Sequence, residues 1–391
     1  MAQVHTQTRR GLVMTAGFVA AAVVVGVLSI GAGWWLPLHL FVVGALSTAI
    51  SAVTQMLAVT WSAAPAPRAG VAATQRWLLG AGAIATVTGR ETARTGLFVA
   101  GGVAVVVAML SLAAILIRIR RDAVTPRFAP AIDAYVAAVV AGAIGMTIGI
   151  VLGSGRAGAN AAELREVHLT LNVFGLIGLV VAGTLPFFAA TQVRTKMSPR
   201  ATPTRMRSTS AMLAAATVVT AFGHLAARPT VVAAGLAVYA LGLLMIGALL
   251  PIYARRHLSW AGPRVVQLGA GLAWWVAMTA ALAATSVHGA SDRAVLQALV
   301  IGGFAQILVA SLAYLGPVLR GGGHRLLSAG FAVTRSWVSL VAGNAAAVAA
   351  LAGSNQALAV ALTVWLADIA IRAGWLMVAR RRVTLRDGGE A

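Results

Sequence analysis

Histidine is the residue type in this sequence with the clearest capacity for metal chemistry. The 391 residues include seven histidines and no cysteine, so no thiolate is present to bind a metal or to form a disulfide. Four of the histidines lie at the ends of long apolar runs, and these are His39, His168, His224 and His288. The other three stand among basic or polar residues, where we expect solvated side chains.

His39 and His168 form a candidate pair of cofactor ligands. They are 129 residues apart, and each begins a similar apolar stretch; Asn172 follows His168 by one helical turn and can orient its ring. A neutral imidazole nitrogen binds haem iron or copper, while the second ring nitrogen fixes the tautomer. The alternative is a histidine that hydrogen-bonds a carbonyl at a helix end or lies among lipid headgroups. His224 and His288 are further candidate metal ligands, although nothing repeats around them.

The elements that must position these side chains are membrane helices. The sequence is 60% hydrophobic and 10% charged, with a mean hydropathy of +0.88, and its apolar runs are long enough to cross a hydrocarbon core of about 30 Å. These runs are apolar on all sides, which excludes the alternating pattern of a β-barrel. We therefore predict an all-α integral membrane protein with a bundle of twelve helices. The predicted spans are 11–33, 37–61, 71–89, 95–117, 131–153, 167–190, 209–227, 230–253, 264–286, 295–319, 326–351 and 356–379.

The positive charge of the chain predicts its orientation. The formal net charge is +21, but the arginines form short clusters between apolar runs, which argues against a nucleic-acid-binding domain. With the N-terminus in the cytoplasm, 22 of the 30 Lys and Arg residues lie in inner loops and tails. The positive-inside rule thus predicts a multi-pass protein of the inner (plasma) membrane with both termini cytoplasmic, and it places the four candidate histidines at outer ends of spans.

A weak internal repeat accompanies this topology. No loop is long enough for a second domain, so residues 1–391 form a single polytopic domain, and a period of about 130 residues divides it into units of about 1–127, 128–258 and 259–391. Spans 2, 6 and 10 then correspond, with Gly44, Gly175 and Gly303 at comparable depths. Small residues there let helix backbones approach closely. We expect a pseudo-threefold arrangement of four-helix units, with these three spans packed around a shared centre.

Ionisable residues within predicted spans have a structural explanation. Asp368 and Arg372 are four residues apart on one helical face, and Arg335 lies at a similar depth in span 11. We favour a structural ion pair that locks spans 11 and 12 over a proton path. Asp133, at the start of span 5, is expected to cap that helix or to pair with Arg127.

Two stretches carry a resemblance to known membrane proteins. They are HLTLNVFGLIGLVVAGTLPFFAATQVRTKM at 168–197 and GGFAQILVASLAYLGPVLRGGG at 302–323. With the histidines of spans 2 and 6 and the four-helix period, they are similar to the haem-copper oxidase subunit I superfamily and its NnrS-like members. They look closest to the membrane part of actinobacterial proteins fused to multicopper oxidase or copper nitrite reductase domains.

This resemblance implies a b-type haem or a copper ion, a role in electron transfer or in nitrogen-oxide and copper stress, and a cupredoxin or multicopper oxidase partner. The chain departs from the oxidases, because span 10 has no histidine and span 7 has only His224. Oxygen reduction at a binuclear centre is therefore not expected, and whether the chain is an enzyme stays open.

Two other functions compete with a haem protein. Twelve spans with cytoplasmic ends also describe many secondary transporters, although those usually repeat after six spans rather than four. A membrane scaffold for a separate copper enzyme, without a cofactor of its own, is the third alternative. Soluble enzyme classes are excluded, because the sequence lacks a phosphate-binding loop, a nucleophile elbow, an HExxH helix and a dinucleotide-binding fingerprint.

Overall fold

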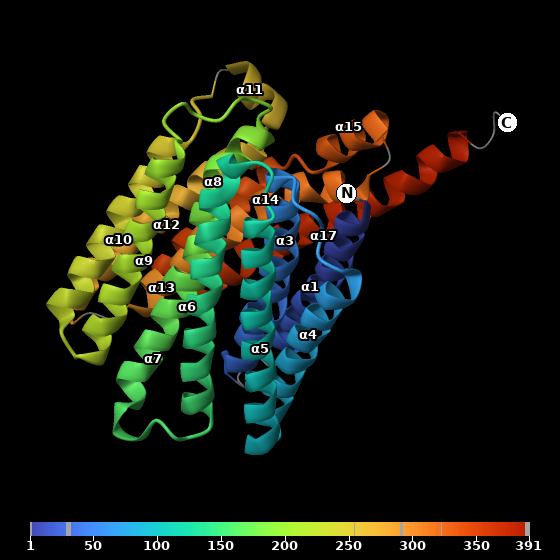
Figure 1. Cartoon of the computed structure of the whole chain (residues 1–391). Helices are drawn as coiled ribbons and strands as arrows, with labels where there is room; N and C mark the ends of the chain where they lie inside the picture. The colour runs from blue at the N-terminus through green and yellow to red at the C-terminus, as the bar shows by residue number, and fades with distance from the viewer. Residues whose placement is uncertain (1, 29–32, 254, 290–291, 322, 388–391) are drawn as a thin grey trace. The chain divides into compact units, whose positions relative to one another are not determined.

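Helices form all of the regular structure that can be described. The computed structural model describes residues 2–28, 33–253, 255–289, 292–321 and 323–387, and every regular element in these ranges is an α-, π- or 3-10 helix (Figure 1). Helices are what a lipid-exposed chain requires, because the hydrocarbon offers the backbone no hydrogen-bond partners. The predicted all-α membrane fold is confirmed at this level.

Ten helices in the described ranges are long and apolar enough to cross a membrane, or eleven if one bent pair counts as a single span. The bent pair is His324–Val333 with Trp337–Leu351, which meet at 40° inside predicted span 326–351. Predicted span 71–89 coincides with a helix of 23 residues, α4 (Ala69–Glu91), which is not among the ten. The structure therefore shows a multi-pass protein, while the count of twelve stays a prediction. Residues 29–32 of the first predicted span lie outside the described residues.

The chain divides into two compact units. Unit 1 comprises Met1–Thr184 and Thr202–Val232, and unit 2 comprises Leu185–Ala201 and Ala233–Ala391. The elements up to the end of unit 1 are α1 (Ala2–Leu28), α2 (Trp35–His39), η1 (Leu40–Leu46), α3 (Ser47–Ser62), α4 (Ala69–Glu91), α5 (Thr95–Arg121), η2 (Pro126–Phe128), α6 (Ala129–Gly153), η3 (Gly158–Asn160), α7 (Ala161–Thr170), η4 (Leu171–Gly178), α8 (Leu179–Gln192) and α9 (Pro203–Leu225). They continue with α10 (Pro229–Leu249), α11 (Arg255–Ala261), α12 (Pro263–His288), α13 (Arg293–Ala298), η5 (Leu299–Ala305), α14 (Gln306–Arg320), α15 (Gly323–Val333), α16 (Trp337–Leu351) and α17 (Asn355–Asp387).

Unit 1 is built from helices that pack beside their neighbours in sequence. Helix α1 packs along η1 and α3. Helices α4 and α5 form a long hairpin, and α5 also packs on α6 (Figure 1). The hairpin is close because Gly101 of α5 leaves room for the backbone of Thr86 in α4, which a Cβ there would overlap. Helix α6 in turn supports η4 and α7, and its buried Tyr135 shares a hydrogen bond of 2.8 Å with Thr184. Helix α6 is therefore the support for the second candidate histidine.

Unit 2 has its core around Trp275 of α12, whose side chain is fully buried. Its ring packs against Phe304 of η5 at a centroid distance of 4.9 Å and lies 6.2 Å from Tyr239 of α10. The neighbouring Trp274 donates its indole N–H to Asn344 of α16 over 2.8 Å. Large aromatic side chains thus join three helices where a membrane core offers few polar contacts.

Three membrane helices each contain a π-helical segment, and they are the three helices that correspond in the predicted repeat. The segments are η1, η4 and η5, and they hold Gly44, Gly175 and Gly303. A Cβ on Gly44 would overlap Phe18 of α1, one on Gly175 would lie 2.8 Å from the Cβ of Ala141 in α6, and one on Gly303 would lie 3.4 Å from the Cβ of Trp275 in α12. Gly44 and Gly175 therefore admit the preceding long helix, as expected for small residues, whereas a Cβ at Gly303 would make an ordinary contact with α12. The shared centre and the pseudo-threefold arrangement stay predictions.

Candidate functional site

His39 lies at the junction between α2 and the π-helical segment η1. Its Nδ1 is 2.7 Å from the carbonyl oxygen of Trp35, and its ring stacks on the Trp35 indole at a centroid distance of 4.1 Å and an angle of 20°. A carbonyl oxygen only accepts hydrogen bonds, so Nδ1 carries the proton. In the neutral imidazole Nε2 then holds a lone pair, the form in which histidine binds iron or copper.

His168 has the same arrangement but takes its support from another helix. Its Nδ1 donates to the carbonyl oxygen of Gly145 in α6 over 2.7 Å. The ring lies in a notch of α6, because a Cβ on Gly149 would be only 2.7 Å from the His168 Cε1. Asn172 donates to the His168 carbonyl over 2.8 Å, and its Nδ2 is also 3.4 Å from His168 Nδ1. Because Nδ1 already carries a proton, this approach is no hydrogen bond; Asn172 is tied to the His168 main chain, and its role in orienting the ring stays a prediction.

The two imidazoles both belong to unit 1, His39 where α2 meets η1 and His168 near the end of α7. Both are half-buried, and no hydrogen-bond partner is found for either Nε2 among the described residues. A cation lies near His39, because the Arg90 guanidinium of α4 is 5.6 Å from the centre of the Trp35 ring on which His39 stacks.

The other two candidate histidines are in different surroundings. His224 is half-buried in the last turn of α9 in unit 1. His288 ends α12 in unit 2, where it is exposed and its Nδ1 donates to the carbonyl of Ala284 over 2.7 Å. No group of three or more His, Cys, Asp and Glu side chains able to hold a metal ion occurs in the described ranges. Two axial imidazoles are enough for a haem iron, so the pair His39 and His168 fits haem better than a copper ion with three or more ligands.

The predicted ion pair of Asp368 and Arg372 is confirmed, and both side chains also form hydrogen bonds with other residues. Arg372 donates through Nε to Asp368 over 2.8 Å, and its Nη1 donates to the carbonyls of Val333 and Arg335 over 2.7 and 2.9 Å. The second carboxylate oxygen of Asp368 accepts from the Ser336 hydroxyl over 2.6 Å. The pair thus locks α17 onto the break between α15 and α16. Arg335 joins only through its carbonyl, since its side chain donates to Trp260.

The expectation for Asp133 was wrong. Its two carboxylate oxygens accept from Arg120 of α5 over 3.0 Å and from Arg207 of α9 over 3.1 Å, rather than from the nearby Arg127. The side chain lies one turn inside α6, and the helix hairpins bring those two arginines to it from distant parts of the sequence. Asp133 therefore ties three helices of unit 1 together and has no link to the histidine pair.

The glycine notch under His168 was missed by reasoning from residue chemistry. Gly145 and Gly149 are four residues apart, which is the small-xxx-small spacing that permits close helix approach, so a signal for the notch was present. What the sequence did not indicate is that a histidine ring rather than a helix backbone fills it. No protein-family model matches this chain, and no curated protein matches its sequence. The site must therefore be judged on its own geometry.

Proposed function

We propose that this chain is a membrane haem protein in which His39 and His168 are the axial ligands of a b-type haem. One observation carries the proposal. Two half-buried imidazoles of unit 1 each donate Nδ1–H to a main-chain carbonyl, which leaves each Nε2 with a lone pair that could bind a metal. Histidines that bind a metal through one ring nitrogen usually donate a hydrogen bond from the other, often to a main-chain carbonyl.

The surroundings suit a haem in other respects. Arg90 supplies a cation near His39, and haem presents anionic propionates that a guanidinium can bind. Both histidines adjoin π-helical segments, which recur at functional sites because they reposition side chains. Bound haem would carry one electron at a time by cycling its iron between the ferrous and ferric states. We therefore propose a role in electron transfer, and in nitrogen-oxide or copper stress as the NnrS-like resemblance implies.

The proposed topology has twelve spans in three four-helix units, with both termini in the cytoplasm. Three π-helical segments in spans 2, 6 and 10 support the repeat, since each begins within a few residues of the position expected from a period of about 130 residues. Helix α4 and the bent pair α15 and α16 are the additional spans that twelve requires. A cupredoxin or a multicopper oxidase is the proposed redox partner, at the outer surface.

An absorbance spectrum of the purified protein tests this proposal. The detergent-solubilised chain, produced with added haem precursor, is expected to show a Soret band and the sharp visible bands of a six-coordinate low-spin haem when reduced. His39→Ala and His168→Ala should each abolish the low-spin spectrum. His288→Ala is the matched control, because His288 also donates Nδ1–H to a carbonyl but is exposed and lies in unit 2.

Two results would overturn the proposal. A folded protein without any Soret band would leave the scaffold function as the better explanation. A low-spin band that survives both alanine substitutions would show that other residues bind the haem.

A further inference from the structure

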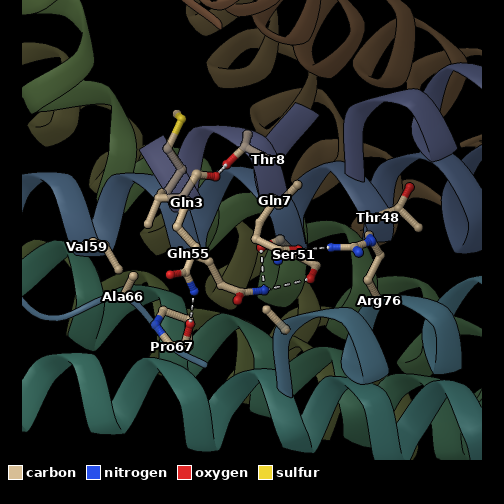
Figure 2. Close-up of a pocket in the computed structure, with 14 residues that line it drawn as sticks. Gln3, Gln7, Thr8, Thr48, Ser51, Gln55, Val59, Ala66, Pro67 and Arg76 are labelled. Carbon is tan, nitrogen blue, oxygen red and sulfur yellow. Dashed lines mark hydrogen bonds between the residues drawn. The ribbon is translucent and has the colours of Figure 1, made fainter. Parts of the chain in front are cut away.

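A small cavity with a mixed apolar and polar lining lies between α1, α3 and α4 of unit 1 (Figure 2). Its volume of about 30 Å³ is room for about two water molecules. Polar side chains from all three helices line it, among them Gln7 and Thr8 of α1, Ser51 and Gln55 of α3 and Arg76 of α4. None of the lining residues is an aspartate or a glutamate.

Arg76 is a buried cation without a counter-charge. Arg76 is only 7% exposed, and its Nη1 donates a hydrogen bond to the Oε1 of Gln7 over 2.8 Å. The ion pairs found among the described residues do not include Arg76, and the charge of another cation, Arg10, acts on it. Burying a guanidinium costs free energy of desolvation unless an anion or several hydrogen-bond acceptors compensate it. The single amide oxygen of Gln7 supplies only a small part of this compensation.

Several of the other polar groups that line the cavity have their donors engaged, while the amide oxygens of Gln3 and Gln55 remain acceptors elsewhere in the lining. Ser51 donates its hydroxyl proton to Gln75 over 2.7 Å, Gln55 donates to the Ser51 carbonyl over 3.1 Å, and Thr8 donates to the Val4 carbonyl over 2.9 Å. Gln7 turns its oxygen toward Arg76, so its amide N–H groups are further donors beside the guanidinium (Figure 2). The part of the cavity next to Arg76 thus offers positive charge and donors.

We propose that this cavity binds a small inorganic anion, held by the guanidinium of Arg76 and the amide of Gln7. The charge excludes a metal cation, and a volume of two water molecules admits a halide or a nitrite ion. The same chemistry would also suit a phosphate oxygen of a lipid headgroup that reaches the cavity from outside, and the experiment distinguishes the two sources. The site lies on α1, α3 and α4 and does not depend on the haem proposal.

Binding of radiolabelled chloride to the full chain in a neutral detergent tests the proposal. Wild-type protein is expected to bind chloride saturably, and unlabelled nitrite should compete. Arg76→Met, which keeps the length of the side chain without its charge, should weaken binding at least tenfold. Arg68→Met is the matched control, since Arg68 precedes α4, is exposed and does not line the cavity.

A second variant keeps the test decisive if Arg76→Met does not fold. Gln7→Glu places a carboxylate next to the guanidinium and thus supplies the anion from the chain itself. It should abolish chloride binding while raising the melting temperature measured without chloride. Absence of saturable binding to the wild type, or equal binding by Gln7→Glu, would overturn the proposal. If the protein binds no chloride but binds phosphatidylglycerol from vesicles, and this lipid binding is lost in Arg76→Met, the cavity is a site for a lipid headgroup instead.

Discussion

Neutralising Asp368 tests how strongly the half-buried ion pair of unit 2 holds its helices together. The carboxylate accepts hydrogen bonds from Arg372 over 2.8 Å and from Ser336 over 2.6 Å, and the side chains of the pair are 24% and 11% exposed. Asp368→Asn keeps the size of the side chain and removes its charge. A hydrogen bond to a charged group contributes roughly 1 kcal/mol more than one between neutral groups. With two such bonds weakened, we expect the free energy of unfolding to fall by about 2 kcal/mol.

A double-mutant cycle isolates the ion pair from the other effects of each substitution. Asp368→Asn, Arg372→Met and the double variant are compared with wild type by unfolding in mixed micelles of a neutral detergent and dodecyl sulfate. Because Arg372 keeps two carbonyl acceptors, we expect a coupling energy of about 1 to 2 kcal/mol rather than the larger value of a fully buried pair.

The pair of Arg118 and Asp122 on α5 is the matched control. It has the same spacing of four residues, but its atoms are 3.7 Å apart and its side chains are 85% and 46% exposed. A cycle at this surface pair should give a coupling energy of about 0 to 0.5 kcal/mol. Equal coupling energies at the two pairs would refute the conclusion that burial and the contact with the break between α15 and α16 strengthen the intramembrane pair.

Three other substitutions have outcomes that follow from single contacts. Gly149→Ala brings a methyl group within 2.7 Å of the His168 ring, so the low-spin haem spectrum proposed for this protein should be weakened or lost while circular dichroism stays helical. Gly44→Ala places a methyl group on the ring of Phe18 and should destabilise the protein by about 1 to 3 kcal/mol in the same unfolding assay. Asp133→Asn loosens two half-exposed ion pairs, and its cost should not exceed about 1 kcal/mol; a larger loss would mean that they act as one buried network.

The intramembrane ion pair was predictable because both members lie on one helix. Asp368 and Arg372 are four residues apart, and helical geometry alone brings such side chains together. Asp133 was not predictable in this way. Its nearest cation in sequence, Arg127, is not its partner, because the packing of α5 and α9 on α6 brings Arg120 and Arg207 to its carboxylate. A contact between helices depends on their rotation, which neighbouring residues in the chain do not reveal.

The histidine pair was also predictable from the sequence only in part. The spacing of His39 and His168 and their similar flanking stretches selected them as candidates, and both lie in unit 1. The protonated nitrogen of His168 was not predictable, since its acceptor is the Gly145 carbonyl on another helix. The π-helical segments were hidden for a different reason. In a helix that is apolar on all sides, a wider turn leaves no mark on the hydropathy pattern.

Composition and hydropathy alone determined that this chain is a multi-pass α-helical membrane protein, because lipid permits few other structures for runs of apolar residues. Short-range spacing determined the ion pair on α17 and nominated the two histidines. Tertiary packing decided which ring nitrogen of His168 keeps its lone pair and where α6 opens a notch for an imidazole. It also left Arg76 beside a cavity without a carboxylate. These features depend on the rotation and approach of whole helices, which many weak contacts along their length set together.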